Sequence, residues 1–111
     1  MTEGDVVLTP VPQANGQIKN RPAIVLREMR PHGDLLVCGV STQLSQRVPG
    51  FDEVILPADA DFAASGLVSA SLIRLGFLAT VPRRSVAGSI GAISPERHKR
   101  LLKTLSDYLI A

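Results

Sequence analysis

Glycine and proline residues interrupt this chain so often that its apolar segments stay short. Nine Gly and eight Pro are spread over 111 residues, and the apolar runs between them have the length of strands. Short strands joined by turns of this composition are typical of a small, strongly bent antiparallel sheet or partial barrel. We therefore predict a mainly β fold with five or six strands, in the segments 5–9, 23–27, 35–41, 52–56, 71–81 and 86–93.

The segment 94–111 is the clearest helix in the sequence. Ser94 is a suitable N-cap, and Pro95 suits the first helical position. Apolar residues recur on one side of this helix at helical spacing: Leu101, Leu102, Leu105, Tyr108 and Leu109. Its basic side chains are expected to lie largely on the other side: Arg97, Lys99, Arg100 and Lys103. Tyr108 and the strand residue Phe77 are predicted to be buried.

A shorter helical turn is predicted at residues 59–65, where Asp59 or Asp61 would cap the start and Gly66 would end the helix. The two histidines are expected to be solvated. His98 stands in the basic run of the last helix, and His32 stands in a Pro-His-Gly turn.

The composition limits the classes of partner. The formal net charge of +2 permits a nucleic-acid partner without arguing for one. Aromatic residues make up 4% of the chain and Trp is absent, so aromatic stacking is not expected to be the main way of holding bases. An apolar content of 45% suffices for one folded domain, which we expect to span residues 1–111. No apolar run approaches ~20 residues, so no membrane span is expected.

Neither a metal site nor a cofactor site is expected. The chain has one cysteine and two distant histidines, with no CxxC or HxxxH spacing. Cys38 lies inside an apolar run and is interpreted as a small buried residue. Because a single cysteine cannot form a disulfide within the chain, we expect a reducing compartment, namely the cytoplasm.

Polar side chains that suit phosphate stand at the ends of two predicted strands. Arg21 precedes the second strand, whereas Ser41, Thr42 and Gln43 lie where the third strand ends. If these strands pair through the turn between them, the start of one lies beside the end of the other. Arg21 would then lie near Ser41 and Thr42 at one rim of the sheet. The residues alone leave open a surface arginine beside an ordinary hydroxyl-rich turn.

A guanidinium beside hydroxyl groups suits a phosphodiester. The guanidinium holds two phosphoryl oxygens through parallel hydrogen bonds and stays charged at physiological pH. A hydroxyl adds a further donor. In RNA the attacking group can be the substrate's own 2′-OH, so the protein has to orient the phosphate and stabilise the charge that builds on it. Such a reaction needs no metal ion in principle.

Five segments match a known pattern of residues: GDVVL at 4–8, NRPAIVL at 20–26, VSTQ at 40–43, SLIRLGFL at 71–78 and IGAIS at 90–94. In this order, and followed by a helix, they resemble the MazF/PemK family of toxins from bacterial toxin–antitoxin systems. The resemblance runs from about Gly4 to the end of the last helix. The RPA motif and VSTQ at this distance are its most specific part.

The resemblance implies an SH3-like (CcdB/MazF-type) barrel with a C-terminal helix, usually a homodimer. It also implies a metal-independent, sequence-selective endoribonuclease that cuts single-stranded RNA and leaves a 2′,3′-cyclic phosphate. An antitoxin would neutralise the protein by covering the RNA groove. The residues that the resemblance makes catalytic are Arg21, Ser41 and Thr42. The residues that it places on the RNA are Lys19, Asn20, Gln43 and Arg74.

The chain departs from the family pattern at three places. Ser41 stands where many relatives have threonine, and Ser71 and Leu72 stand where the family has Asp-Gln. A few extra residues around Gly76 to Pro82 alter the next turn. We expect these changes to affect RNA sequence preference first and activity second. The alternative is an SH3-like binding protein without catalysis: a gyrase-binding toxin like CcdB, a peptide-binding adaptor, or a family member that no longer cuts RNA. CcdB carries a tryptophan at its target-binding end, and this chain has none.

Overall fold

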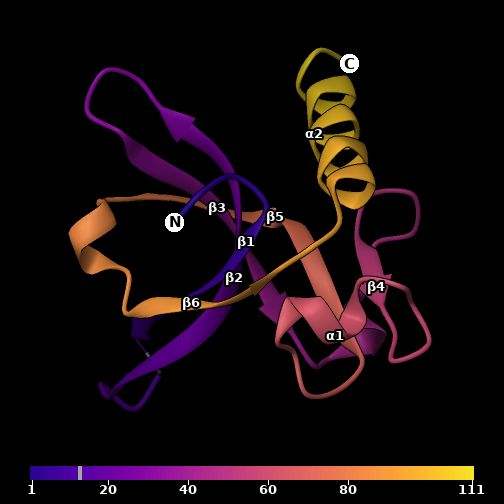
Figure 1. Cartoon of the computed structure of the whole chain (residues 1–111), viewed down its shortest axis with the longest axis horizontal. Helices are drawn as coiled ribbons and strands as arrows, with labels where there is room; N and C mark the ends of the chain where they lie inside the picture. The colour runs from indigo at the N-terminus through magenta and orange to yellow at the C-terminus, as the bar shows by residue number, and fades with distance from the viewer. Residues whose placement is uncertain (13) are drawn as a thin grey trace.

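In the computed structural model, which describes residues 1–12 and 14–111, six strands form one curled sheet that resembles half a barrel (Figure 1). The strands are β1 (Asp5–Pro12), β2 (Ile18–Met29), β3 (Asp34–Ser41), β4 (Glu53–Ile55), β5 (Ser71–Val81) and β6 (Gly88–Ala92). Their order in the sheet is β4-β5-β3-β2-β1-β6. Every neighbouring pair is antiparallel, so the predicted mainly β fold is confirmed.

The predicted helix is also confirmed, as α2 (Pro95–Leu109). The backbone N–H of Arg97 donates to the Ser94 side chain at 3.1 Å, so Ser94 is the N-cap. The shorter helix is α1 (Phe62–Ser65), which ends at Gly66 in the left-handed conformation with φ of 75°. Two 3₁₀ turns complete the fold: η1 (Leu44–Gln46) and η2 (Arg83–Ser85).

The sheet is packed on both faces in its centre. On the face covered by α2, a core cluster combines strand and helix residues, including Val6, Ile24, Leu26, Cys38, Ile73, Leu101 and Leu105. A smaller cluster on the opposite face comprises Val7, Ala23, Val25, Leu35 and Val37. Residues 23–26 of β2 are therefore all buried, although successive side chains point to opposite faces. Each buried side chain of this size contributes roughly 1.5–3 kcal/mol of transfer free energy.

β1 and β2 are longer than the sequence predicted. Pro10 and Pro12 lie inside β1, opposite Asn20 and Ile18 of β2. Proline is tolerated there because β6 pairs only with residues 5–8 of β1. Beyond Leu8, β6 no longer pairs with β1, so a missing N–H on that side of the strand breaks no β1–β6 hydrogen bond.

A bulge in β5 overturns the predicted burial of Phe77. Cys38 of β3 pairs with Leu78, but the next residue, Gly39, pairs with Arg74, so three residues of β5 have no partner on β3. The alternation of faces is broken there, and Phe77 is 56% exposed. The predicted burial of Tyr108 is also wrong, since it is 64% exposed and packs against Phe51 with 4.9 Å between ring centroids.

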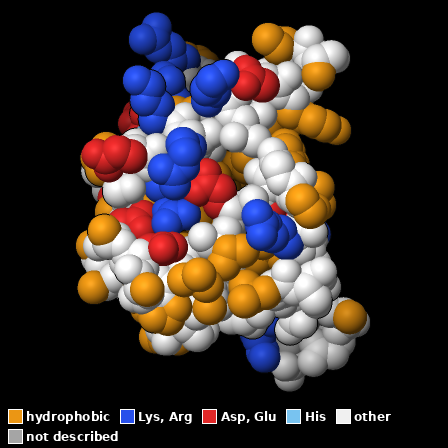
Figure 2. Space-filling model, turned by 90° about the vertical axis from the view of Figure 1, so that its right-hand side faces the viewer, with side chains coloured by type: hydrophobic (Ala, Val, Ile, Leu, Met, Phe, Trp, Pro, Cys, Tyr) orange, Lys and Arg blue, Asp and Glu red, His pale blue; other side chains and the backbone are white. Residues whose placement is uncertain are grey.

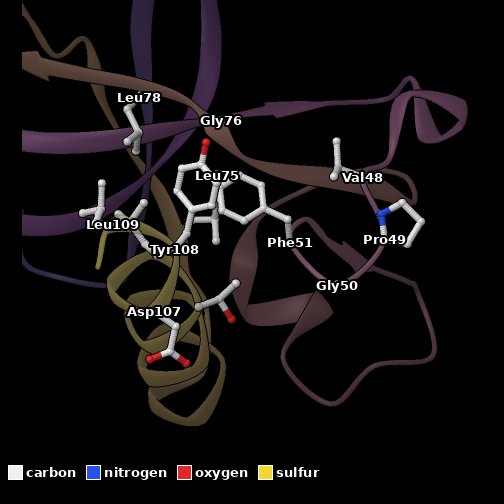
Figure 3. Close-up of a pocket in the computed structure, with 12 residues that line it drawn as sticks. Val48, Pro49, Gly50, Phe51, Leu75, Gly76, Leu78, Asp107, Tyr108 and Leu109 are labelled. Carbon is white, nitrogen blue, oxygen red and sulfur yellow. The ribbon is translucent and has the colours of Figure 1, made fainter. Parts of the chain in front are cut away.

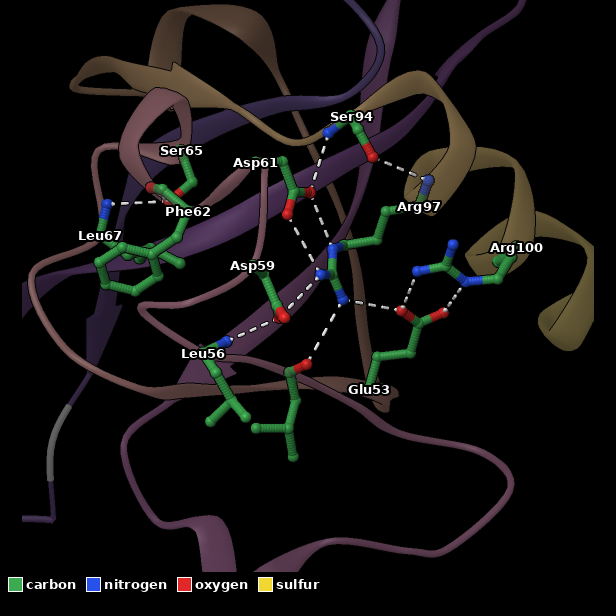
Figure 4. A network of polar contacts seen from close by, with 11 residues as sticks. Glu53, Leu56, Asp59, Asp61, Phe62, Ser65, Leu67, Ser94, Arg97 and Arg100 are labelled. Atoms are coloured by element: carbon green, nitrogen blue, oxygen red, sulfur yellow. Dashed lines mark hydrogen bonds and ion pairs between the residues drawn. The ribbon is translucent and has the colours of Figure 1, made fainter.

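Arg97 is buried, contrary to its predicted position on the solvent side of α2. Its guanidinium makes ion pairs with Asp61 at 2.8 Å, Glu53 at 2.9 Å and Asp59 at 3.1 Å (Figure 4). Neither aspartate caps α1 through its side chain, because both are oriented towards Arg97. We call these four residues the Arg97 cluster. Figure 2 shows this side of the molecule, where acidic side chains lie among basic ones.

The Arg97 cluster joins the start of α2 to the segment that contains β4 and α1. The hydrogen bond from Arg97 lowers the pKa of the Asp61 carboxyl to about 2, against the opposing effect of burial. Asp61 also accepts the backbone N–H of Ser94 at 3.0 Å. Half-buried His98 is a further correction, since its Nε2 lies 2.8 Å from the carbonyl oxygen of Leu26 rather than in solvent. His32 is exposed, as predicted.

α1 packs on β6 at a distance that only glycine permits. A Cβ added to Gly91 would lie 2.2 Å from the carbonyl oxygen of Ala64, and one added to Gly66 would lie 2.1 Å from that of Ile90. Both contacts are with backbone atoms, so neither can be relieved by a side-chain rotation. This seam fixes the position of the segment that follows α1, residues 67–69.

Candidate functional site

A groove of about 560 Å³ lies on the face of the sheet away from α2. Residues two apart in the strands share this face, and they line the groove: Thr9 and Val11, Arg21 and Ala23, Gly39 and Ser41, Ala79 and Val81. Two loop segments complete the wall, Thr42 with Gln43 after β3, and residues 67–69 after α1. The groove therefore unites strand ends and loops from distant parts of the chain.

Arg21 and Ser41 line the same groove from neighbouring strands. The pairing of β2 with β3 ends where Ala23 is opposite Gly39, and Arg21 and Ser41 each lie two residues beyond that pair, at the same end of the two strands. Arg21 is exposed, and both side chains line the groove. The structure thus brings together the two strand ends that the sequence predicted to meet.

The Ser41 hydroxyl is oriented by the loop that follows it. Its oxygen accepts the backbone N–H of Gln43 at 3.0 Å. A serine oxygen that accepts one bond can still donate its own proton to a ligand. Thr42 and Gln43 are exposed beside it. Ser41 is therefore held in place by the backbone with its proton available for a substrate oxygen.

Arg74 gives the groove a second guanidinium. It lies opposite Gly39 on β3, two residues before Ser41. Its Nη1 donates to the Gln46 side chain at 3.2 Å, which links β5 to η1. Its guanidinium carbon lies 5.5 Å from the centroid of the Phe77 ring. Arg74 is thus held on the β5 side of the groove, whereas Arg21 lines it from β2.

Lys19 and Asn20 extend β2 beyond the groove. Both are exposed, and they pair with Val11 and Pro10 of β1. Neither is among the described residues that line the groove. Strand alternation puts Lys19 on the same face as Arg21 and Asn20 on the other face.

The groove is electropositive. Its charged lining residues are Arg21 and Arg74, and among the described residues that line it none is Asp or Glu. Hydroxyl groups of three lining residues add donors: Ser41, Thr42 and Ser69. This combination is suited to a polyanion that needs several hydrogen-bond donors along its length.

Sequence reasoning missed two apolar residues of the groove, Val68 and Phe77. Val68 is 96% exposed at the tip of the segment after α1, and Phe77 is exposed by the bulge in β5. Gly76 was the available signal, because a glycine inside a strand often marks a bulge. The position of Val68 depends on the close packing of α1 on β6, and no local sequence pattern indicates that packing.

A second hollow, of about 830 Å³, lies between the end of α2 and residues 48–51 (Figure 3). Phe51 and Tyr108 face each other in it, with Val48, Leu78 and Leu109 around them. Asp107 is the charged residue among those described in its lining. An apolar hollow with a carboxylate suits packing against another apolar surface better than binding of an anion.

Other site chemistries receive little support from the described residues. Burial raises the pKa of the Cys38 thiol to about 12, so it is a protonated core residue as predicted and a poor nucleophile. No group of three His, Cys, Asp or Glu in the described ranges is placed to hold a metal ion. None of the helices in this part of the chain is long and apolar enough to cross a membrane.

Comparison with known proteins gives the family. The chain is similar to the Mycobacterium tuberculosis toxin MazF-mt6, with a TM-score of 0.68, 20% sequence identity and coverage of 93% of each chain. At this identity the similarity shows the shared fold. No curated protein sequence matches the chain. A family model described as "PemK-like, MazF-like toxin of type II toxin-antitoxin system" matches residues 2–109. The chain therefore belongs to the PemK-like, MazF-like family of toxins of type II toxin–antitoxin systems.

Proposed function

We propose that this protein is an endoribonuclease toxin that cleaves single-stranded RNA in the groove without a metal ion. One observation carries the proposal most directly. Arg21 of β2 and Ser41 of β3 line one groove, whose described lining contains two arginines and no carboxylate. A phosphodiester is the ligand that such a pair of donors fits best.

The proposed reaction is an internal transesterification of RNA. The 2′-hydroxyl of one nucleotide loses its proton as its oxygen bonds to the adjacent phosphorus. The bond from phosphorus to the 5′-oxygen breaks, and the leaving 5′-oxygen gains one proton. The products are a 2′,3′-cyclic phosphate and a 5′-hydroxyl, so atoms balance without water or a cofactor. The protein contributes by holding the phosphate in line for attack and by stabilising its added negative charge.

Each residue has a role in this scheme. Arg21 binds two phosphoryl oxygens through its fork of N–H groups, and Ser41 donates its hydroxyl proton to the same phosphate. Thr42 supports them from the adjoining loop. Gln43 and Arg74 contact the RNA on one side of the cut, and Lys19 and Asn20 contact it where β2 extends beyond the groove. These last two would act at a distance from the reacting phosphate, because they do not line the groove.

The family match also supports the remaining parts of the proposal. We propose that a cognate antitoxin neutralises the protein by covering the groove, that the toxin acts as a homodimer, and that it meets its RNA in the cytoplasm. The apolar hollow between Phe51 and Tyr108 is compatible with burial against a second copy. A peptide-binding adaptor is less favoured, since Phe77 is the one aromatic residue among the described lining of the groove.

The test is incubation of the protein with a long RNA in EDTA, followed by analysis of the product ends. We expect cleavage that leaves 2′,3′-cyclic phosphate and 5′-hydroxyl ends. Arg21→Ala should reduce the rate by about 10²–10³, the usual cost of removing one donor to a developing charge. Arg84→Ala is the matched control, because Arg84 is exposed in η2, outside the groove. A folded Arg21→Ala protein with full activity would remove Arg21 from the mechanism.

A further inference from the structure

We propose that Phe77 and Arg74 form a stacking subsite for one base of the RNA, at the nucleotide next to the cleaved phosphate. The inference rests on the proposed function, since it names a binding subsite within the same groove. It also revises the expectation from composition, because one exposed ring at the right place can hold a base in a chain with few aromatic residues.

The exposure of the Phe77 side chain results from the path of the β5 backbone and does not depend on its rotamer. The three unpaired residues of the β5 bulge carry it out of the alternation that would bury it. Its ring lies against Gly39, where an added Cβ would be 3.5 Å from both Cβ and Cγ of Phe77. The ring is therefore supported by the β3 backbone from below while 56% of the residue stays open to the groove.

Arg74 fixes the second side of this surface. Its guanidinium lies over the Phe77 ring, 5.5 Å from the centroid, in cation–π contact. The hydrogen bond from Arg74 to Gln46 limits the guanidinium's freedom to swing away. Unpaired RNA bases stack on aromatic rings and on guanidinium planes, and here a guanidinium lies over a ring. The two side chains thus form one preorganised stack, on whose open side a base can continue the stacking.

The other aromatic residues are engaged elsewhere. Phe51 and Tyr108 pack on each other beside α2, and Phe62 packs against the core cluster under α2. With three Phe and one Tyr in the chain, Phe77 is the one whose ring is presented to the arginine-lined groove. Exposure of a large apolar ring among phosphate-binding groups is best explained by a ligand that carries both an aromatic base and a phosphate.

The register gives the position of the stacked base. Arg74 is opposite Gly39, and Ser41 is two residues further along β3. Two residues of strand span about 7 Å. The stacking surface therefore lies one short step from the Arg21–Ser41 phosphate site, which is the distance of a neighbouring nucleotide and not of a remote one.

The test compares ring removal with conservative replacement. The cut site is first mapped on a long RNA, and short RNAs with the normal base or an abasic nucleotide next to the cut are then assayed. Phe77→Leu, which keeps apolar volume but has no ring face, should lower kcat/KM by roughly 5- to 100-fold on the normal RNA. Phe77→Tyr should keep most of the wild-type rate. Met29→Ala is the control, since Met29 is an exposed apolar residue at the far end of β2, outside the described lining of the groove.

The abasic RNA separates stacking from a structural role. Wild type and Phe77→Leu should cut the abasic RNA at nearly equal rates, because neither has a base to stack. If Phe77→Leu cuts the normal RNA as fast as wild type does, the subsite is overturned and the ring serves a protein partner or no ligand. An equal loss on normal and abasic RNA would also overturn the subsite, since the effect would then be structural.

A binding assay distinguishes failure of the subsite from failure of the proposed function. Short RNAs with 2′-deoxy sugars to block cleavage carry the fluorescent base 2-aminopurine at each position in turn. Wild type should quench one position strongly, and Phe77→Leu should abolish that quenching. If wild type shows this quenching but cuts no RNA, the subsite stands while the nuclease proposal fails. If wild type cuts RNA but quenches no position, the subsite fails while the nuclease proposal stands. If wild type neither cuts nor quenches, both fail.

Discussion

The two arginine sites of this protein use the same side chain in opposite ways. Arg97 is buried and surrounded by Asp61, Glu53 and Asp59. Arg21 is exposed at a strand end, in a groove whose described lining includes no carboxylate. A guanidinium whose charge is balanced by buried carboxylates supports the fold, whereas a guanidinium in an electropositive groove lies where an external anion is attracted. The chemistry of an arginine is thus set by the acids around it.

The largest effect should come from breaking the Arg97 cluster. Arg97→Met should lower the free energy of unfolding by about 3–5 kcal/mol, because it leaves partly buried carboxylates without a counter-charge. Urea denaturation of the variant and of wild type measures the difference. Arg100→Met is the control, since Arg100 pairs with Glu53 from a more exposed position on α2. A loss below about 1 kcal/mol in Arg97→Met would show that the cluster is not a main support of the fold.

The opposite pattern is expected at Arg21. Arg21→Ala should change the free energy of unfolding by less than about 1 kcal/mol, as is usual for an exposed charged side chain. The same variant should lose RNA cleavage by about 10²–10³. Urea denaturation and a cleavage assay on one preparation give both values. If Arg21→Ala destabilises the protein as much as Arg97→Met does, Arg21 contributes to the stability of the fold, and the two arginine sites do not differ in the way described.

The seam between α1 and β6 supplies a sharper comparison of two glycines in one strand. Gly91→Ala should destabilise the protein by about 3 kcal/mol, at the upper end for overpacking, because its Cβ would meet the Ala64 carbonyl at 2.2 Å. Gly88→Ala is the matched control, since nothing lies within 4 Å of its added Cβ. Thermal unfolding of both variants provides the measurement. If the Gly91→Ala and Gly88→Ala variants are equally stable, the close packing of α1 on β6 does not contribute to the stability of the protein.

A smaller effect is expected from pH. The pKa of Asp61 is lowered from its ordinary value of 3.8 to about 2 in the folded protein. The stabilisation from ionised Asp61 is therefore present above about pH 4 and is lost as pH falls through about 2, amounting to roughly 2 kcal/mol. Urea midpoints between these pH values should fall less steeply for Asp61→Asn than for wild type. Parallel slopes would contradict the coupling of Asp61 to Arg97.

The sequence allowed the sheet, the last helix and the position of Arg21 and Ser41 at neighbouring strand ends to be predicted, because each depends on local or nearly local signals. Short sequence segments contain the signals for all three: apolar runs of strand length, the Ser94–Pro95 helix start, and the turn that joins two neighbouring strands. The position of Arg97 was not predictable in this way. Its carboxylate partners lie 36 or more residues away, and helical periodicity alone assigns a basic residue to the solvent side.

Phe77 was mispredicted for a related reason. Period-two alternation along β5 places it with Ile73 and Leu75 in the core, and it would lie there in a regular strand. The bulge is a property of the pairing between β5 and β3, which skips three residues between Arg74 and Leu78. The irregular pairing of β5 with β3 thus places Phe77 in the groove and not in the core. The proposed base subsite depends on this position.

The central claim is that Arg21 and Ser41 act on the same phosphate, and a double-mutant cycle tests it most directly. Cleavage rates of wild type, Arg21→Ala, Ser41→Ala and the double variant are measured on one sensitive fluorogenic RNA in EDTA. Groups that act as a unit are strongly non-additive, so the double variant should be little slower than the slower single variant. If the two losses instead multiply in the double variant, Arg21 and Ser41 act independently, and the account of one shared phosphate is contradicted.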